Sequence, residues 1–301
     1  MGVEYYTTRF LLQARQKGCQ FGRTLTIGRQ NVQLNPRDLD RLAREFSFTP
    51  GDLTNTQPQS ALTYVEPVLT TLLKASSVES VDVSSYEGAT HVHDMNAPLP
   101  EKFHGQFDTI LEAGSLEHIF NLPTALKNLM QAVKVGGTIF IQTPANNYFG
   151  HGFYQFSPEL FYRVFSEENG FEVERMHLFE HFFPCFFFAT KEHEVADPAK
   201  VGRRVQLVNN RPALLLIEAR RTAEKPIFAK TPMQSDYVPV WETSKSQMPT
   251  AAQTPVVLQR KWQHLLYALP LRLIGRLPLQ YWLARGNKPA LSNRDFFKPA
   301  P

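Results

Sequence analysis

The sequence predicts an α/β fold built around a mostly parallel β-sheet. Short apolar stretches typical of strands alternate with helical stretches from about residue 23 to residue 220, which is the pattern of a parallel α/β sheet. The chain has 301 residues, of which 43% are hydrophobic and 20% charged, so it can bury a sizeable core. This composition excludes a disordered, collagenous or coiled-coil chain.

The first half of the pattern begins with a strand over residues 23–27 that ends at Gly28. Asn35 and Pro36 then provide an N-cap and a first-turn proline for a helix that continues to about Phe46. After a loop rich in Thr, Pro and Gln, we expect a helix over about 62–74 and three strands, at 78–83, 91–93 and 107–112.

The second half begins with a helix over about 122–133, for which the Gly136, Gly137 pair is a stop signal. Ser157 and Pro158 cap a further helix that reaches about residue 168. The remaining strands are expected at 138–142, 171–178 and 214–219. The long connection between the last two strands holds the aromatic cluster 182–188, which would either close over a substrate or pack in the core.

Three segments follow from composition: an α/β domain over 1–222, a linker over 223–255 and a basic helical tail over 256–301. Eight basic residues and no acidic ones lie between Glu242 and Asp295, whereas the whole chain has a net charge of +4. The remainder is therefore net negative, which does not support nucleic-acid binding. The apolar stripe of the tail indicates either an interfacial helix on anionic lipid or a helix docked on the domain or on a second subunit; it comprises Trp262, Leu265, Leu266, Leu269 and Leu273.

The chain shows no sign of export or membrane crossing. Its longest apolar run, 182–189, is broken by Pro184 and falls well short of the ~20 residues of a membrane span, and the first ten residues lack the apolar core of a signal peptide. Cys19 and Cys185 are too few for a disulfide scaffold and lack metal-ligand spacing. We therefore expect a cytoplasmic protein, with peripheral membrane contact through the tail as the alternative.

Candidate ligand-binding residues lie at the carboxyl ends of the predicted strands, where ligands bind in open parallel sheets. Asp82 ends the second strand and is placed to accept both hydroxyls of a ribose, or else to cap the following turn. Asp94 is placed to accept an adenine amino group, or else to form an Asx-turn. His91 and His93 share one face of a strand, but no third ligand accompanies them, so no metal is expected there.

Three motifs appear in order along this pattern: VDVS at 81–84, SLEHI at 115–119 and KVGGTIFIQTPANN at 134–147. Together they resemble the class I S-adenosylmethionine-dependent methyltransferases. The segment GHGFYQFSPELFY, at 150–162, is similar to a subset of bacterial members associated with polysaccharide or secondary-metabolite assembly. The resemblance covers about half of the chain, from residue 23 to residue 170.

The resemblance implies a Rossmann-like, seven-stranded, mostly parallel sheet whose last strand is antiparallel, with S-adenosylmethionine as methyl donor. It makes Asp82 the ribose-binding acid and Asp94 the adenine-side acid, and it places the turn that begins at Glu112 against the methionine portion. The implied donor-binding residues are Gly28, Arg29, Asp82, Val83, Asp94, Met95, Glu112, Ala113 and Gly114. The family's first strand usually ends in a glycine-rich loop, whereas this chain has TIGRQNVQL with only Gly28.

Methyl transfer to a hydroxyl requires alignment of the reacting atoms and removal of one proton, for which an imidazole is suited near neutral pH. His151, between two glycines, and His118 are the candidate bases, and the alternative for both is a hydrogen-bonded structural histidine. Tyr154, Gln155 and Phe156 would line the acceptor pocket or form a hydrophobic staple.

The predicted function is O-methylation of a sugar or small-metabolite hydroxyl. The alternative is a non-catalytic relative that binds or scaffolds, and the short glycine loop favours it. A nicotinamide dehydrogenase is disfavoured, because the Gly-x-Gly-x-x-Gly fingerprint is absent from the first turn.

Overall fold

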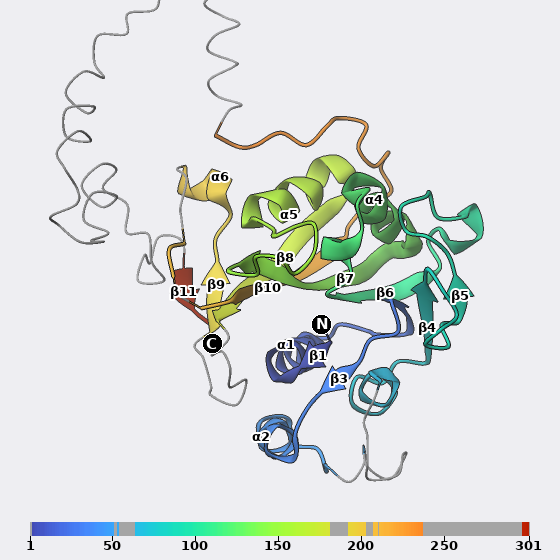
Figure 1. The fold of residues 1–301 in the computed structure, drawn as a ribbon, viewed down its shortest axis with the longest axis vertical. Helices are drawn as coiled ribbons and strands as arrows, with labels where there is room; N and C mark the ends of the chain where they lie inside the picture. Colours follow the sequence, from blue (N-terminus) through green and yellow to red (C-terminus); the bar gives the residue numbers. More distant parts are fainter. Residues whose placement is uncertain are drawn as a thin grey trace, which may run out of the picture.

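The computed structural model describes residues 2–50, 53, 64–180, 192–202, 207–209, 211–236 and 297–300. In this part of the chain a central sheet lies between two layers of helices (Figure 1). The sheet has nine strands, whose spatial order is β11 (Phe297–Pro299), β9 (Glu192–Val195), β8 (Phe171–Glu180), β10 (Ala213–Arg221), β7 (Val133–Asn146), β6 (Phe107–Ala113), β2 (Arg23–Ile27), β4 (Ser77–Asp82) and β5 (His91–Val92).

The sheet is mostly parallel, as the sequence predicts. Strands β5, β4, β2, β6 and β7 pair in parallel. Strand β10 is antiparallel to both β7 and β8, which confirms the expected antiparallel strand. Beyond β8, the antiparallel strands β9 and β11 extend the sheet, so the described part has nine strands where seven were expected.

Each face of the sheet is covered by its own helices and has its own core (Figure 1). On one face lie α4 (Leu122–Ala132) and α5 (Pro158–Val164), with fully buried residues such as Leu129. On the other lie α1 (Tyr5–Gln16), α2 (Pro36–Phe46) and a short π-helical segment (Val68–Leu72), with buried residues such as Leu42. The result is a three-layer α/β/α arrangement.

The N-terminal elements are not evident from the sequence pattern. Strand β1 (Val3–Glu4) pairs in parallel with β3 (Val32–Gln33) in a separate two-stranded sheet, and α1 follows it directly. No side chain caps the start of α1. The helix is held instead by packing, because the ring of Phe10 contacts Phe140 of β7 at 6.3 Å between ring centroids.

Several element boundaries differ from the predictions. In the residues that the structure describes, the helix expected over 62–74 spans residues 66–72, of which 68–72 are π-helical. The pair Gly136, Gly137 does not stop a helix: α4 ends at Ala132, and β7 begins at Val133 and runs through both glycines. Helix α5 ends at Val164, earlier than expected, and a 3₁₀ turn (Glu167–Asn169) follows.

Some predictions fall outside the described residues, namely the aromatic cluster 182–188, Cys185 and the tail stripe from Trp262 to Leu273. Residues 297–299, within the segment expected to be a helical tail, form strand β11. Cys19 is a free thiol, partly buried. Among the helices that the structure describes, none is long and apolar enough to cross a bilayer.

The start of α2 has the N-cap that the sequence predicts at Asn35. The side chain of Asn35 accepts a hydrogen bond from Asp38 N at 3.0 Å, and the Asp38 carboxylate accepts one from Asn35 N at 3.3 Å, which completes a capping box. We expect Asn35→Ala to lower the free energy of unfolding by about 1 kcal/mol, measured by urea denaturation, because one N-terminal amide of the helix loses its partner. Asn35→Asp retains an acceptor and serves as the control. An unchanged midpoint in Asn35→Ala would contradict the assignment.

Candidate functional site

The candidate site lies at the carboxyl edge of the sheet, where β2 and β6 are neighbours. From β2 the chain continues to β4 and β5 on one side, and then crosses back to β6 and β7 on the other. In open α/β sheets, the usual ligand site is the crevice outside the carboxyl ends of the strands at such a reversal of strand order. Gly28 follows β2, and Ser115 follows β6, on the two sides of this reversal.

Three polar side chains converge above Gly28. Its φ of +71° is a left-handed conformation, and its amide donates a hydrogen bond to Val81 O at 2.7 Å. A Cβ on Gly28 would lie 3.3 Å from Ser115 Oγ, 3.4 Å from Gln30 Nε2 and 3.7 Å from Asp82 Oδ2. A Cβ would therefore be tight against Ser115 Oγ, and the left-handed φ would strain any residue other than glycine.

Asp82 lies at the end of β4, and the two oxygens of its carboxylate have different neighbours. One oxygen, Oδ1, accepts a hydrogen bond from Ser84 N at 3.3 Å, which is the turn-capping geometry. The other oxygen is directed toward Gly28. The capping role and a position facing the crevice are therefore compatible in this structure.

Arg29 does not fill the crevice. Its guanidinium donates to Glu66 Oε1 at 2.7 Å and to Glu87 O at 2.9 Å, and it lies 3.9 Å from the ring centroid of Tyr64. Gln30 is the residue that narrows the crevice. Its buried amide donates to Ile27 O and, at 3.3 Å, to Ser115 Oγ, so it links the end of β2 to the turn after β6.

The remaining residues that the resemblance assigns to donor binding, Val83, Asp94 and Met95, are spread over the loops that follow β4 and β5. Val83 is 67% exposed, whereas Met95 is buried. Asp94 forms the Asx-turn that was its alternative interpretation: its Oδ1 accepts from Asn96 N at 2.9 Å, and this bond lowers the pKa of the carboxyl group. His91 is hydrogen-bonded to Glu79 at 2.7 Å.

A buried carboxylate shapes the turn that joins β6 to the next segment. Glu112 has no exposed surface, and it accepts hydrogen bonds from Ser115 N and, at 3.1 Å, from Leu116 N. Burial raises the pKa of Glu112, and the nearby Glu117 carboxylate raises it further. Ala113 and Gly114 continue from β6 into this turn, and both are buried.

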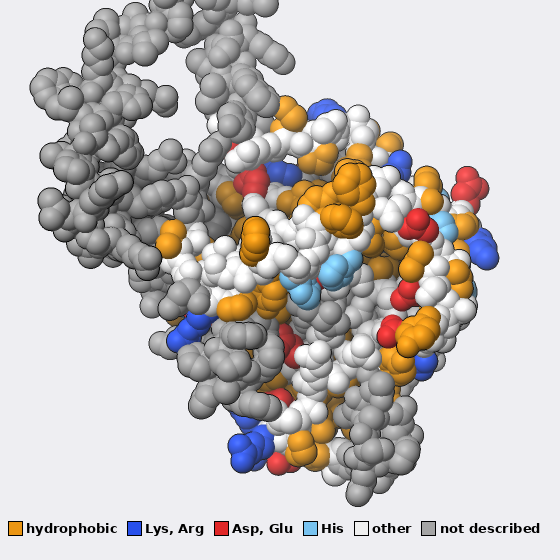
Figure 2. Space-filling view, in the orientation of Figure 1, with side chains coloured by type: hydrophobic (Ala, Val, Ile, Leu, Met, Phe, Trp, Pro, Cys, Tyr) orange, Lys and Arg blue, Asp and Glu red, His pale blue; other side chains and the backbone are white. Residues whose placement is uncertain are grey.

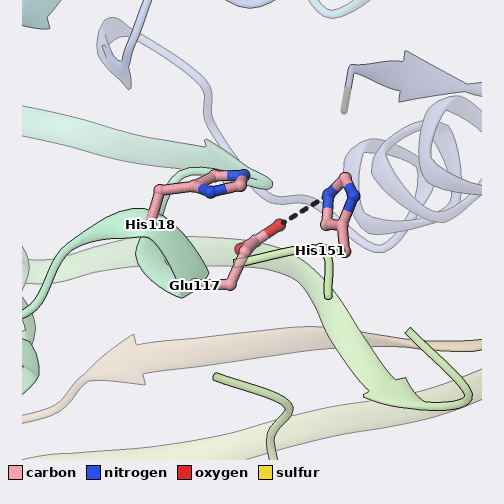
Figure 3. Close-up of side chains that lie close together, drawn as sticks. All are labelled: Glu117, His118 and His151. Atoms are coloured by element: carbon pink, nitrogen blue, oxygen red, sulfur yellow. Dashed lines mark ion pairs between the residues drawn. The ribbon is translucent and has the colours of Figure 1, made fainter. Parts of the chain in front are cut away.

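The structure brings His118 and His151 together, and with them a residue that the sequence did not single out. The rings of the two histidines lie 5.2 Å apart between centroids, and Glu117 lies between them (Figure 3). Glu117 Oε1 is 3.8 Å from His151 Nε2. Burial raises the pKa of Glu117 and lowers the pKa of both histidines. Figure 2 shows pale blue histidine side chains on this face, beside hydrophobic ones.

One backbone hydrogen bond holds the loop after β7 against the turn after β6: Phe153 N donates to Glu117 O at 2.7 Å. A second, from His151 N to Tyr148 O at 3.0 Å, shapes the loop itself. Between them, Gly152 has a φ of +137°, and a Cβ there would lie 2.8 Å from Glu117 O. The close approach of His151 to the turn therefore requires glycine at position 152.

The predicted acceptor residues take part in holding this loop. Tyr154 Oη donates to Phe120 O at 2.7 Å, and Gln155 Oε1 accepts from Tyr148 N at 2.8 Å. Phe156 is buried and packs on Phe161 at 5.7 Å between ring centroids, four residues into the helix capped by Ser157. Phe156 thus forms the hydrophobic staple that was its alternative interpretation.

A separate cavity of about 480 Å³ lies at the opposite, amino edge of the sheet. Four of its charged side chains form two ion pairs, Lys134 with Asp108 at 2.8 Å and Arg175 with Glu218. None of the predicted site residues lines this cavity.

Glu117 could have been found from the sequence, because it lies in SLEHI directly before His118. Its role was hidden because a glutamate next to a strand end is ordinarily a solvated residue, whereas here the side chain is completely buried. The partner that makes it informative, His151, is 34 positions away, and only the loop geometry brings the two together.

Glycine 152 can be tested against a matched neighbour. Gly150 also has a positive φ, +83°, but a Cβ there would contact nothing within 4 Å. We expect Gly150→Ala to cost about 1–2 kcal/mol in free energy of unfolding from backbone strain alone. Gly152→Ala should cost more, because the new Cβ also displaces the loop from Glu117 O. Chemical denaturation of the two variants checks this, and an equal loss in both would show that the loop does not depend on this contact.

Comparison with known proteins assigns no family. No family model and no curated protein matches the chain. Among solved structures, it is similar to a SAM-dependent methyltransferase of Thermotoga maritima (16% identity, 72% of this chain and 89% of that one, TM-score 0.38). It is also similar to the YcgJ protein of Bacillus subtilis (12% identity, 71% and 100%, TM-score 0.38). A third is a branched-chain polyamine synthase of Thermus thermophilus (16% identity, 73% and 57%, TM-score 0.35). Similarities at these scores do not assign a function.

Proposed function

We propose that this chain is an S-adenosylmethionine-dependent methyltransferase that O-methylates a hydroxyl group of a sugar or small metabolite. The observation that carries the proposal is the carboxylate of Asp82, directed toward Gly28 beside the reversal of strand order. A carboxylate at the end of this strand is suited to accept both vicinal hydroxyls of an adenosine ribose. The mostly parallel sheet with the antiparallel strand β10 agrees with this interpretation.

The residues around Gly28 fit a nucleoside ligand. Space that a Cβ would occupy is left open between Ser115 Oγ and Asp82 Oδ2, and the side chain of Arg29 is held away from it by Glu66. We assign Asp82 to the ribose and the exposed Asp94 to the adenine side. The buried turn from Glu112 to Gly114 would lie against the methionine portion.

The acceptor side is assigned to the loops after β6 and β7. His118 and His151 lie there at the same edge of the sheet as Asp82 and Gly28, because β6, β7, β2 and β4 run in parallel. Next to the histidines, the exposed rings of Phe120 and Phe153 meet edge to face at 5.6 Å between centroids. An apolar wall beside polar groups suits a sugar ring, which has both C–H faces and hydroxyl groups.

The chain's own residues would align the acceptor and handle one proton. The donor, when bound, supplies a methyl group activated by its sulfonium sulfur, to which the electron pair of the broken carbon–sulfur bond returns. The acceptor oxygen must then lie in line with that bond, and the rigid loop from Tyr148 to Phe153 is suited to hold it there. A ring nitrogen of His151 or His118 is placed to accept the hydroxyl proton.

Replacement of Asp82 tests the donor site. We expect Asp82→Asn to weaken the binding of S-adenosylhomocysteine by about 10- to 100-fold in isothermal titration, because a hydrogen bond to a charged acceptor contributes about 1.5–3 kcal/mol. Asp94→Asn should have a smaller effect, since its carboxylate is fully exposed and occupied by its own turn. Glu101→Gln, at an exposed position outside the site, is the control. Equal affinity in Asp82→Asn and the control would remove the donor-site assignment.

A second candidate function is a non-catalytic binding or scaffolding module. It is favoured by the hydrogen bonds that the Gln30 amide makes to Ile27 O and to Ser115 Oγ, because they hold this side chain beside Gly28 and narrow the space there. Isothermal titration separates the two functions. Absence of binding by both the methyl donor and its demethylated product at millimolar concentration would favour the scaffold.

A further inference from the structure

The cluster of Glu117, His118 and His151 has the composition and spacing of a metal site. Each residue offers one ligand atom, and the three atoms all lie within 4.8 Å of one another. Two imidazoles and one carboxylate form a mixed nitrogen and oxygen donor set. Such a set suits first-row transition cations such as Zn²⁺, Mn²⁺ and Fe²⁺, whereas Mg²⁺ and Ca²⁺ prefer oxygen ligands.

Two of the ligand atoms are buried without a hydrogen bond. Within the described residues, neither Glu117 Oε1 nor His151 Nε2 has a hydrogen-bond partner, although both are shielded from solvent. The side chain of Glu117 has no exposed surface at all. A buried carboxylate oxygen without a partner lowers the stability of the fold, and a bound cation would supply that partner.

The spacing of these two atoms fits a shared ion better than a direct bond. They are 3.8 Å apart, beyond hydrogen-bond distance. Two ligands of one tetrahedral ion, each about 2.0–2.1 Å from it, are about 3.3 Å apart. Small side-chain rotations of Glu117 and His151 would therefore close the site around an ion.

Other contacts hold the ligands in place. Thr143 Oγ1, from β7, donates to Glu117 Oε2 at 3.4 Å and thereby directs the other carboxylate oxygen toward His151. The backbone bond from Phe153 to Glu117 fixes the loop that carries His151. Partners of this kind around the ligands are characteristic of real metal centres.

We propose that Glu117, His118 and His151 bind one divalent transition-metal cation. Three protein ligands leave coordination positions open, as in catalytic rather than structural sites. His118 is exposed and His151 is partly exposed, whereas Glu117 is buried, so the cluster is reached from the side of the histidines. The open side is therefore accessible to a small molecule.

The role of the cation rests on the proposed function. A hydroxyl group coordinated at an open position would have a lowered pKa, and its proton would leave to solvent. A histidine nitrogen that binds the ion cannot also accept that proton. In the metal-bound protein, the ion therefore takes the place of a histidine base.

Direct metal binding tests the site. The full chain, free of any affinity tag and treated with a chelator, is titrated with Zn²⁺ in a calorimeter and its metal content is measured by mass spectrometry. We expect one Zn²⁺ per chain and at least about 10-fold weaker binding in His118→Ala and in His151→Ala. His93→Ala is the matched control, because this partly buried histidine at the same edge lies outside the cluster and its Nε2 is hydrogen-bonded to Ala97 O, at 3.3 Å. Mg²⁺ should compete poorly.

Substitution with Co²⁺ gives an independent readout. Its visible absorption in the wild-type chain should show nitrogen and oxygen ligands and should be lost in both histidine variants. Because both histidines reach the surface, these variants are expected to keep the wild-type midpoint of thermal unfolding, which checks that they fold. Absence of Zn²⁺ binding, or binding that is equal in the His118, His151 and His93 variants, overturns the proposal.

The same samples separate this proposal from the proposed function. Donor binding is measured with S-adenosylhomocysteine in the presence of a chelator, where the metal site contributes nothing. Metal binding without donor binding would overturn the methyltransferase and leave the metal site in place. Donor binding, with methyl transfer that the chelator does not reduce, would leave the function and overturn the metal's role.

Discussion

The site depends on one backbone hydrogen bond, from Phe153 N to Glu117 O at 2.7 Å. It joins the loop after β7 to the turn after β6, and a second hydrogen bond, from Tyr154 Oη to Phe120 O, links the same two segments. Phe153 N can approach Glu117 O this closely because residue 152 is a glycine with a φ of +137°, where a Cβ would lie 2.8 Å from that oxygen. The bond fixes the position of His151 relative to Glu117 and His118, so that the three side chains form one group.

The turn after β6 links the two halves of the site. Ser115 contributes to the rim above Gly28, where its hydroxyl donates to Ile27 O at 2.9 Å. Glu117, two residues later, belongs to the histidine cluster. The buried carboxylate of Glu112 holds both in place by accepting bonds from the amides of the turn. A ligand that displaces Ser115 would therefore also displace Glu117. Such a link between the two parts of the site is what the alignment of donor and acceptor requires.

Seven of the nine strands of the central sheet in the described residues were predictable because their signals are local, whereas β9 and β11 were not predicted. Strand β2 was predicted with its observed bounds, and α2 starts at the N-cap that Asn35 and Pro36 indicate. Helix α1 was missed because it has no capping side chain and is stabilised by contacts with β7 and β8, far along the chain. The glycine pair was expected to follow the helix as a stop signal, whereas β7 already begins at Val133 and shifts its register against β6 between Val133 and Thr138, where Gly136 has a φ of +86°.

The sequence by itself determined that the chain forms a mostly parallel α/β sheet and that polar residues gather at its carboxyl edge. Both follow from local patterns, because the apolar periodicity of a strand and the residues that end it are neighbours in the sequence. The direction of the Asp82 carboxylate, the turning of Arg29 toward Glu66 and the narrowing by Gln30 were decided only by tertiary structure. The same holds for the group of Glu117, His118 and His151. Side-chain direction and loop-to-loop distance depend on contacts between residues far apart in the chain, and no local pattern records them.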